Sequence, residues 1–317
     1  KAKKKGFDTK KLQALLSQSK SRADTKMPSQ VQLSSLLEHY QNGRFGDAEK
    51  LAISLTREFP RHQFGWKALG AVLKQTGRIR ESLVPSQKAA ALSPQDAEAH
   101  SNLGVTLKEL GRMDEAEASL RQAIALKPDF AEAHNNLGNT FKELRRLEDA
   151  QASYEQTVVL KPDYAEAHSN LGATLQELGR LEEAEASYTQ AIVLKPDFAE
   201  AHYNFGITLK ELGRLEEAEA SLRQAIALKP DFAEAHNNLG ITLKELDRLE
   251  EAEARYTQAI ALKSDFAEAR YNLGVLWFES RQYNLAAEQF ELCDTPQSKF
   301  YAIQCSYLQD EETIFYE

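Results

Sequence analysis

Two kinds of polar side chain recur along this chain of 317 residues at a constant spacing of 34. An imidazole can bind a metal or carry a proton, and a side-chain amide offers donors and an acceptor that suit a peptide backbone. The histidines of this series are His100, His134, His168, His202 and His236. The asparagines are Asn102, Asn136, Asn170, Asn204, Asn238 and Asn272.

The histidines do not have the spacing of a metal site. Imidazoles one repeat apart are separated by about a helix diameter, roughly 10 Å, whereas zinc needs ligand atoms about 2.0–2.1 Å from one ion. Trp66 and Arg270 stand at the same place in other repeats. We therefore expect a packing position, with no metal and no other cofactor. The sequence also contains no glycine-rich phosphate loop and no Ser/His/Asp or Cys/His arrangement, so we do not expect an enzyme.

Charge and composition limit the partners. Residues 1–28 hold eight lysines, one arginine and two aspartates, a balance of +7, so the other residues carry −16 and the whole sequence −9. We expect residues 1–28 to be a disordered basic leader; binding of nucleic acid or anionic lipid by its lysines is the alternative. The acidic remainder argues against a nucleic-acid partner. No apolar run approaches the ~20 residues that span a bilayer, so we expect no membrane insertion.

Two cysteines, Cys293 and Cys305, form no CxxC pair and stand near no histidine cluster. This usage is typical of a reducing compartment, and we expect a cytoplasmic protein.

An Asn-Leu-Gly or Asn-Phe-Gly core recurs with the same spacing, which predicts a repeat architecture. With Ala97 as position 1, six repeats begin at residues 97, 131, 165, 199, 233 and 267, and two weaker ones at 29 and 63. The repeats thus cover residues 29–300. Residues 301–317 are expected to form a C-terminal capping helix or the start of a following segment.

Each repeat is expected to form two helices, A and B. In the repeat at 97, helix A carries apolar residues at helical spacing and ends at Gly111, and helix B ends at Pro128. Gly104 and Ala116 are small residues, which we expect where the two helices cross. A single helix pair buries too little apolar surface to be stable, so the repeats must stack.

The loop between repeats also carries a helix-start pattern. In Pro128-Asp129-Phe130-Ala131-Glu132, the aspartate is expected to cap the next helix A, and Glu132 to complete a capping box.

The repeat resembles that of the tetratricopeptide-repeat (TPR) family. The shared features are a Trp or His before Leu-Gly, a small residue at position 20, an aromatic or aliphatic residue at 24, Ala at 27 and Pro at 32. The position-6 asparagines are most similar to the superhelical arm of O-linked N-acetylglucosamine transferases and related bacterial multi-TPR proteins. The resemblance implies an all-α fold, a right-handed α-α solenoid (TPR superhelix) of about eight 34-residue helix-turn-helix units.

Several residues depart from the pattern. Arg145 and Asp247 replace the glycine of position 15, where we expect a positive φ and a cost of about 1 kcal/mol each. Pro85 falls inside the helix B expected in the repeat at 63, which it should kink or shorten. Pro296 comes two residues early, and residues 300–308 are expected to form a further helix.

In TPR superhelices a stripe of helix A at positions 2, 6, 9 and 13 lines the concave groove, and the resemblance implies the same here. Neighbouring helices pack ~8–10 Å apart and an extended peptide advances ~3.3 Å per residue. One asparagine would therefore meet the backbone of a bound peptide at about every third residue. The alternative is that the asparagines bond to the backbone of the neighbouring repeat.

Positions 5 and 9 vary between repeats and would select the ligand. An apolar anchor is expected in the C-terminal half, at Tyr203, Ile207, Ile241, Tyr271 and Phe278. Glutamates at positions 2 and 13 make the groove acidic and would favour a neutral or basic ligand. Alternatively, these glutamates close capping boxes and pair with arginines. Besides the asparagines of position 6, the predicted peptide-binding residues are Asn139, Tyr203, Ile207 and Tyr271.

Three functions agree with these features. The first is a protein–protein interaction scaffold that binds a protein or peptide segment in the groove. The second is the substrate-recognition arm of a larger enzyme, a transferase or an iron/2-oxoglutarate oxygenase, whose catalytic domain lies beyond residue 317. The third is a self-assembling structural repeat protein, a homo-oligomer.

Overall fold

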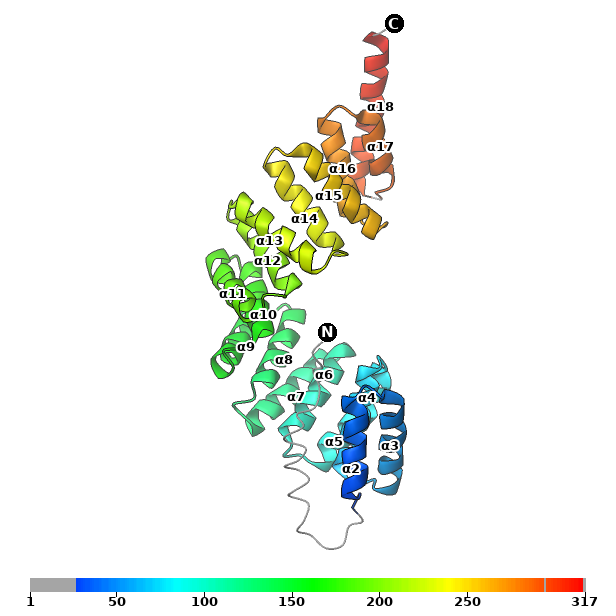
Figure 1. Ribbon diagram of the computed structural model, residues 1–317, viewed down its shortest axis with the longest axis vertical. Helices are drawn as coiled ribbons and strands as arrows, with labels where there is room; N and C mark the ends of the chain where they lie inside the picture. The colour runs from blue at the N-terminus through cyan, green and yellow to red at the C-terminus, as the bar shows by residue number, and fades with distance from the viewer. Residues whose placement is uncertain (1–26, 294, 316–317) are drawn as a thin grey trace. The chain divides into compact units, whose positions relative to one another are not determined.

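Pairs of helices joined by short loops follow one another along the sequence (Figure 1). The computed structural model describes residues 27–293 and 295–315, without the side chains of residues 309–315. Most of the predicted basic leader therefore lies outside the described residues. Contacts divide the protein after Pro162 into two compact units, and within the described ranges the first holds α2–α9 and the second α10–α18.

The first helix of each pair, helix A, has 12 or 13 residues. The A helices are α2 (Gln30–Gln41), α4 (Gln63–Gln75), α6 (Ala97–Glu109), α8 (Ala131–Glu143), α10 (Ala165–Glu177), α12 (Ala199–Glu211), α14 (Ala233–Glu245) and α16 (Ala267–Glu279). The B helices are α3 (Phe45–Glu58), α5 (Ile79–Leu92), α7 (Met113–Leu126), α9 (Leu147–Leu160), α11 (Leu181–Leu194), α13 (Leu215–Leu228), α15 (Leu249–Leu262) and α17 (Tyr283–Glu291). The last helix is α18 (Pro296–Phe315). This order confirms the predicted all-α architecture of helix pairs.

In the six helix pairs from α6–α7 to α16–α17, a glycine of helix A faces a large side chain of helix B. A Cβ at Gly138 would come within 2.7 Å of the ring of Tyr154, and one at Gly104 within 2.6 Å of Leu120. Both large side chains are fully buried. The predicted crossing point is thus correct, because only a glycine lets the side chain of position 24 lie flat against the neighbouring helix.

The turn between helices A and B needs a left-handed residue. Gly111, Gly179 and Gly213 have φ values of 74–75° there. Arg145 and Asp247 adopt φ 59° at the same place, as predicted, and Arg281 does so as well. An L-residue in this conformation has a steric cost of the order of 1–2 kcal/mol.

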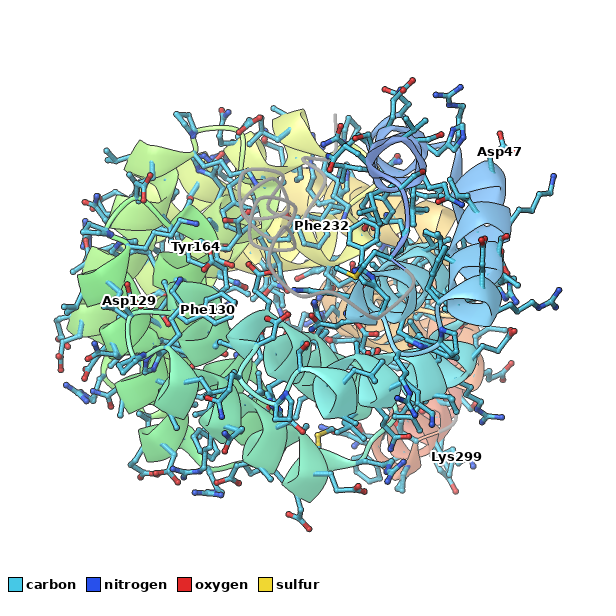
Figure 2. All side chains as sticks on the ribbon, turned by 90° about the horizontal axis from the view of Figure 1, so that it is seen from below. Asp47, Asp129, Phe130, Tyr164, Phe232 and Lys299 are labelled. Atoms are coloured by element: carbon cyan, nitrogen blue, oxygen red, sulfur yellow. The ribbon has the colours of Figure 1, made fainter. Side chains whose placement is uncertain are left out.

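The predicted capping boxes are wrong in most repeats. The N-cap of α8 is Phe130, which makes no side-chain cap, and Glu132 pairs instead with Lys161. The aspartate lies one residue before the N-cap in the Pro-Asp-Phe loop. Figure 2 labels Asp129 and Phe130. In the loop before α6 the order is Pro-Gln-Asp, so Asp96 does occupy the N-cap and accepts from two backbone N–H groups.

The effect expected of Pro85 on helix length is also absent. Helix α5 has 14 residues, the same length as α7 and α9. Pro85 is buried where α5 packs beside Gly70 of α4, and the helix continues past it to Leu92.

Helix α18 covers the end of the last repeat. It begins at Pro296, earlier than the boundary predicted at residue 301. The ring of Tyr301 stacks on that of Phe290, with centroids 5.1 Å apart, and also meets the edges of Tyr271 and Phe278. The apolar residues predicted to anchor a ligand in this repeat are therefore covered by the protein's own last helix.

Candidate functional site

The A helices form one side of each unit. In the first unit α6 contacts α4 and α8, and in the second α12 contacts α10 and α14. Among the described helices, no pair of B helices makes contacts of the same extent. Neighbouring A helices are thus closer together than neighbouring B helices, so the A helices line the inner side of the stack within each unit.

The position-6 asparagines lie on the A helices, and all six are half-buried. In the five repeats from Asn102 to Asn238, the main-chain oxygen of this asparagine accepts from a buried threonine one turn later, as with Asn102 and Thr106 (2.9 Å). The side-chain amides are separate from this bond. Within the described residues, the amides of Asn102, Asn136 and Asn204 make no hydrogen bond.

Two asparagines of the series are engaged by the preceding repeat. The Nδ2 of Asn238 donates to the hydroxyl of Tyr203 and to the main-chain oxygen of Glu234, each at 3.1 Å. The Nδ2 of Asn272 donates to Oδ1 of Asn237 at 3.0 Å. The bonds to Tyr203 and Asn237 use side chains of the neighbouring repeat, whereas the alternative in the sequence analysis was its backbone.

The side chain of position 5 lies at the interface between consecutive repeats rather than exposed to solvent, as Tyr203 shows. Tyr203 packs on Phe232 with ring centroids 4.7 Å apart, and its hydroxyl contacts Asn238. Burial, with the negative charges of Glu234 and Glu268, raises the pKa of Tyr203 to about 12, so its hydroxyl is neutral near pH 7. Tyr203 thus belongs to an interface between consecutive repeats.

The other predicted residues differ in how accessible they are. Asn139 accepts from the hydroxyl of Tyr154 at 2.7 Å. Ile241 and Tyr203 are half-buried, and both pack against the core cluster that contains Tyr256. Ile207 is half-buried one helical turn after Asn204 on α12. Ile207 is therefore a half-buried aliphatic side chain one turn from an unengaged asparagine amide.

The glutamates of position 2 are held by partners within the protein. Lys161 lies 2.9 Å from Glu132, and the corresponding lysines pair with the glutamates of the next three repeats. Glu98 pairs with the buried Lys67, and Glu268 accepts from the amide of Asn237. The inner side is consequently less acidic than a count of its glutamates implies.

The histidines of position 4 bind the loop before their own helix. Nε2 of His100 lies 3.1 Å from the main-chain oxygen of Pro94, and His134, His202 and His236 repeat this contact at 3.0–3.1 Å. Trp66 donates to Pro60 in the same way. The position therefore ties each helix A to its preceding loop. Among the described residues, no group of His, Cys, Asp and Glu has the arrangement of a metal site.

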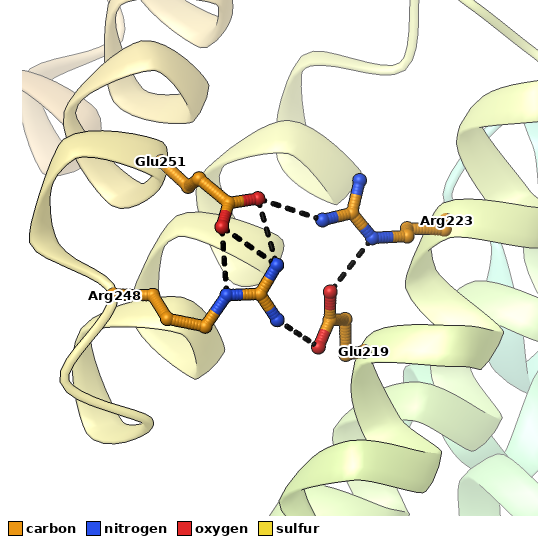
Figure 3. Close-up of polar contacts among 4 residues, drawn as sticks. All are labelled: Glu219, Arg223, Arg248 and Glu251. Atoms are coloured by element: carbon orange, nitrogen blue, oxygen red, sulfur yellow. Dashed lines mark hydrogen bonds and ion pairs between the residues drawn. The ribbon is translucent and has the colours of Figure 1, made fainter.

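Ion pairs connect consecutive B helices. Arg248, just before α15, reaches Glu219 of α13 at 2.6 Å and Glu251 of its own helix at 2.7 Å (Figure 3). Arg223 of α13 pairs with the same two glutamates, with Glu219 at 2.8 Å and with Glu251 at 3.1 Å. The arginine of position 16 makes the same cross-repeat pair in three other repeats, at Arg78, Arg146 and Arg214. These arginines and glutamates are engaged with one another, whereas three amides of the A helices are not engaged by any described residue, so the A-helix side is the candidate for binding.

The repeat pattern matches a known family along much of its length. The family model of the TPR repeat matches residues 106–144, 142–179, 174–213, 206–247 and 243–280, which together span more than half of the sequence. The chain belongs to the TPR family. No curated protein matches this TPR protein in sequence.

Solved structures agree with the TPR fold. The Cut9–Hcn1 hetero-tetramer of APC/C matches with a TM-score of 0.63 at 15% identity, over 93% of this chain and 59% of that one. PilF of Pseudomonas aeruginosa matches with a TM-score of 0.56 at 20% identity, over 62% of this chain and 90% of that one. YrrB, described as a TPR protein with an unusual peptide-binding site, matches with a TM-score of 0.50 at 24% identity, over 58% of this chain and 95% of that one. At these identities the likeness shows the fold alone.

One residue with a clear role was missed in the sequence. Asn237 is fully buried and contacts two residues of the next repeat: its amide donates to Glu268, and its Oδ1 accepts from Asn272. Sequence variation at position 5 had suggested ligand selection there instead. A signal was available, because this position holds serine, asparagine or tyrosine in every repeat from residue 97 onward, and all three can form hydrogen bonds.

Membrane insertion was not expected from the sequence. Among the described helices, none is both long and apolar enough to cross a membrane.

Proposed function

We propose that this TPR protein is a protein-interaction scaffold that binds an extended polypeptide segment along the inner, A-helix side of its units. The observation that carries the proposal is the state of three amides of position 6. Asn102, Asn136 and Asn204 are half-buried, lie on regular helices, and have no side-chain hydrogen-bond partner among the described residues. Asparagine is a poor helix former, so its repetition here calls for a role outside the helix.

The chemistry of an amide fits a peptide backbone. An asparagine can donate to a backbone carbonyl oxygen and accept from an N–H of the same extended strand. A ligand bound in this way is recognised by its backbone, so affinity is largely independent of its sequence. Each hydrogen bond contributes roughly 0.5–1.5 kcal/mol net, since the ligand replaces water. Several such contacts, spaced by the repeat, give useful affinity together.

Sequence preference would come from the side chains beside the amides. Ile207, half-buried after Asn204, offers an aliphatic contact to a ligand side chain. Glu109 and Glu245 at position 13 are exposed, which favours a neutral or basic ligand over an acidic one. YrrB, described as a TPR protein with a peptide-binding site, is consistent with this use of the fold.

The test is a selection of extended peptides from a displayed random library on the wild-type protein. The selected peptides are then measured against the triple variant Asn102→Ala, Asn136→Ala, Asn204→Ala. We expect the dissociation constant to rise by about tenfold or more, with unchanged thermal melting. Asn284→Ala, an exposed asparagine on α17, is the matched control and should bind as the wild type does. Equal affinity for the triple variant and the control would reject the proposed site.

A further inference from the structure

The asparagines of position 6 are identical in sequence but not in availability, and the preceding repeat accounts for the difference. Asn204 follows a repeat with Ser169 at position 5, and its amide is unengaged. Asn238 follows Tyr203 and is engaged by it at 3.1 Å. Asn272 follows Asn237 and is engaged by it at 3.0 Å.

The first unit has the same relation. Asn136 follows Ser101, which is buried and too short to reach it, and the amide of Asn136 is unengaged. Asn102 follows Lys67, whose ammonium group is taken by Asp96 and Glu98 at 2.9 and 2.8 Å. A position-5 side chain therefore engages the next asparagine only if it is long enough and has no stronger partner.

We propose that the residue at position 5 of each repeat is a specificity-determining gate. It sets whether the position-6 asparagine of the next repeat can bind the backbone of a ligand. The proposal rests on the proposed function, since it concerns the same peptide site. Asn102, Asn136 and Asn204 are open contacts, and Asn238 and Asn272 are closed ones. Within the first unit, ligand backbone is accordingly held most strongly at α6 and α8. Within the second unit, it is held most strongly at α12.

At Asn238, engagement uses both amide donors and leaves the acceptor. A side-chain amide has two N–H donors and one oxygen. Asn238 uses its Nδ2 on Tyr203 and on Glu234, so only its oxygen remains for a ligand. It can accept from a peptide N–H but has no donor left for a peptide C=O. Asn204 keeps both functions, so it can bind one ligand residue through two hydrogen bonds.

Tyr203→Phe is the variant that isolates the gate. The ring of Tyr203 stays on Phe232, so the interface between repeats is retained, while the hydroxyl that engages Asn238 is lost. Ser169→Tyr is the reciprocal variant, because Phe198 follows in the next loop as Phe232 follows Tyr203. The first variant opens a contact and the second closes one.

The experiment measures a library-selected peptide against Asn→Ala substitutions in each background. In the wild type we expect Asn238→Ala to weaken binding less than about threefold and Asn204→Ala several-fold. In the Tyr203→Phe background, the loss of peptide affinity caused by Asn238→Ala should become as large as the loss caused by Asn204→Ala. In the Ser169→Tyr background, the loss of affinity caused by Asn204→Ala should fall towards none. Losses that are the same in all three backgrounds would overturn the gate.

A second readout needs no peptide. The side-chain NH₂ signals of Asn238 are followed by NMR, and Tyr203→Phe should shift them and speed their exchange with water, while those of Asn204 stay unchanged. Unchanged signals of Asn238 would also overturn the gate. If no peptide binds any variant but these signals respond, the proposed function fails and the gate between the two side chains stands.

Discussion

Lys67 shows how much a single position-5 residue changes an interface between repeats. Its side chain is only 4% exposed, and its ammonium group contacts both Asp96 and Glu98. Burial opposes the charge of Asp96, but the attraction of Lys67 and the hydrogen bonds to its carboxylate outweigh burial, so the pKa of Asp96 lies below its usual range. A buried charge that has lost its partner is costly, so this cluster couples stability to pH.

The pH dependence follows from the direction of that shift. Because the pKa of Asp96 is lower in the folded protein than in the unfolded state, about 3.9, its stabilisation is complete above about pH 4 and is lost as the pH falls through the folded value. Asp96→Asn should lower the free energy of unfolding by about 2 kcal/mol at pH 7. Urea unfolding followed by Trp66 fluorescence, in a Trp277→Phe background, should show the two curves converge below about pH 4. A constant difference would contradict this interpretation.

The left-handed residue of position 15 gives a second prediction at this scale. Arg281 adopts φ 59°, where Gly213 has 75° and an added Cβ would meet no atom within 4 Å. Arg281→Gly should therefore raise the free energy of unfolding by about 1 kcal/mol, and Gly213→Arg should lower it by a similar amount. Thermal melting of both variants checks the pair. Shifts of the same sign in the two variants would show that side-chain contacts, not backbone strain, determine the change in stability.

What the sequence can predict at this scale depends on how local the cause is. The positive φ of Arg145 and Asp247 follows from the turn that every repeat must make. The engagement of Asn238 by Tyr203 does not, because it joins residues 35 apart whose distance is set by packing. The capping role predicted for Glu132 is wrong for a related reason, since a shift of one residue in the loop moves the N-cap to Phe130.

At the scale of helices, the glycine of position 8 sets how closely A and B approach. A methyl group at Gly138 would overlap the buried ring of Tyr154 at 2.7–2.9 Å. We expect Gly138→Ala to lower the free energy of unfolding by about 1–3 kcal/mol. Gly46→Ala on α3 is the matched control, because a Cβ there meets nothing within 4 Å; it should stabilise by up to about 1 kcal/mol.

Chemical denaturation of the two variants, with the same fluorescence probe, compares them. Equal effects would mean that helix propensity, rather than the close approach of the helices, governs position 8.

Helix boundaries are the best-predicted feature, since apolar spacing and loop glycines repeat in phase. There are two exceptions. Helix α5 keeps its length although Pro85 lies inside it, and Pro85 is buried beside Gly70 of α4. Helix α18 begins at Pro296 because the hydroxyl of Thr295 accepts from the N–H of Ser298 and caps the helix, with proline at its first position. The second exception is therefore a local start signal that the sequence contains.

At the scale of the whole molecule, stability is spread over neighbouring repeats. In such an array each repeat is stabilised mainly by the repeats it touches, so a terminal repeat has one partner fewer. We expect amide hydrogen exchange to be slowest in α6–α8 of the first unit and α12–α14 of the second, and fastest in α2. Hydrogen exchange by mass spectrometry provides the profile. Uniform protection from α2 to α17 would show instead that the array unfolds as one.

The proposed function depends on contact between the position-6 amides and the backbone of a bound polypeptide. A double-mutant cycle between Asn204→Ala and N-methylation of single amides in a library-selected peptide, measured by calorimetry, tests this contact. We predict one methylated position whose effect disappears in the Asn204→Ala variant, with a coupling energy of about 1 kcal/mol. Coupling near zero at every peptide amide would contradict direct contact and move the site away from these asparagines.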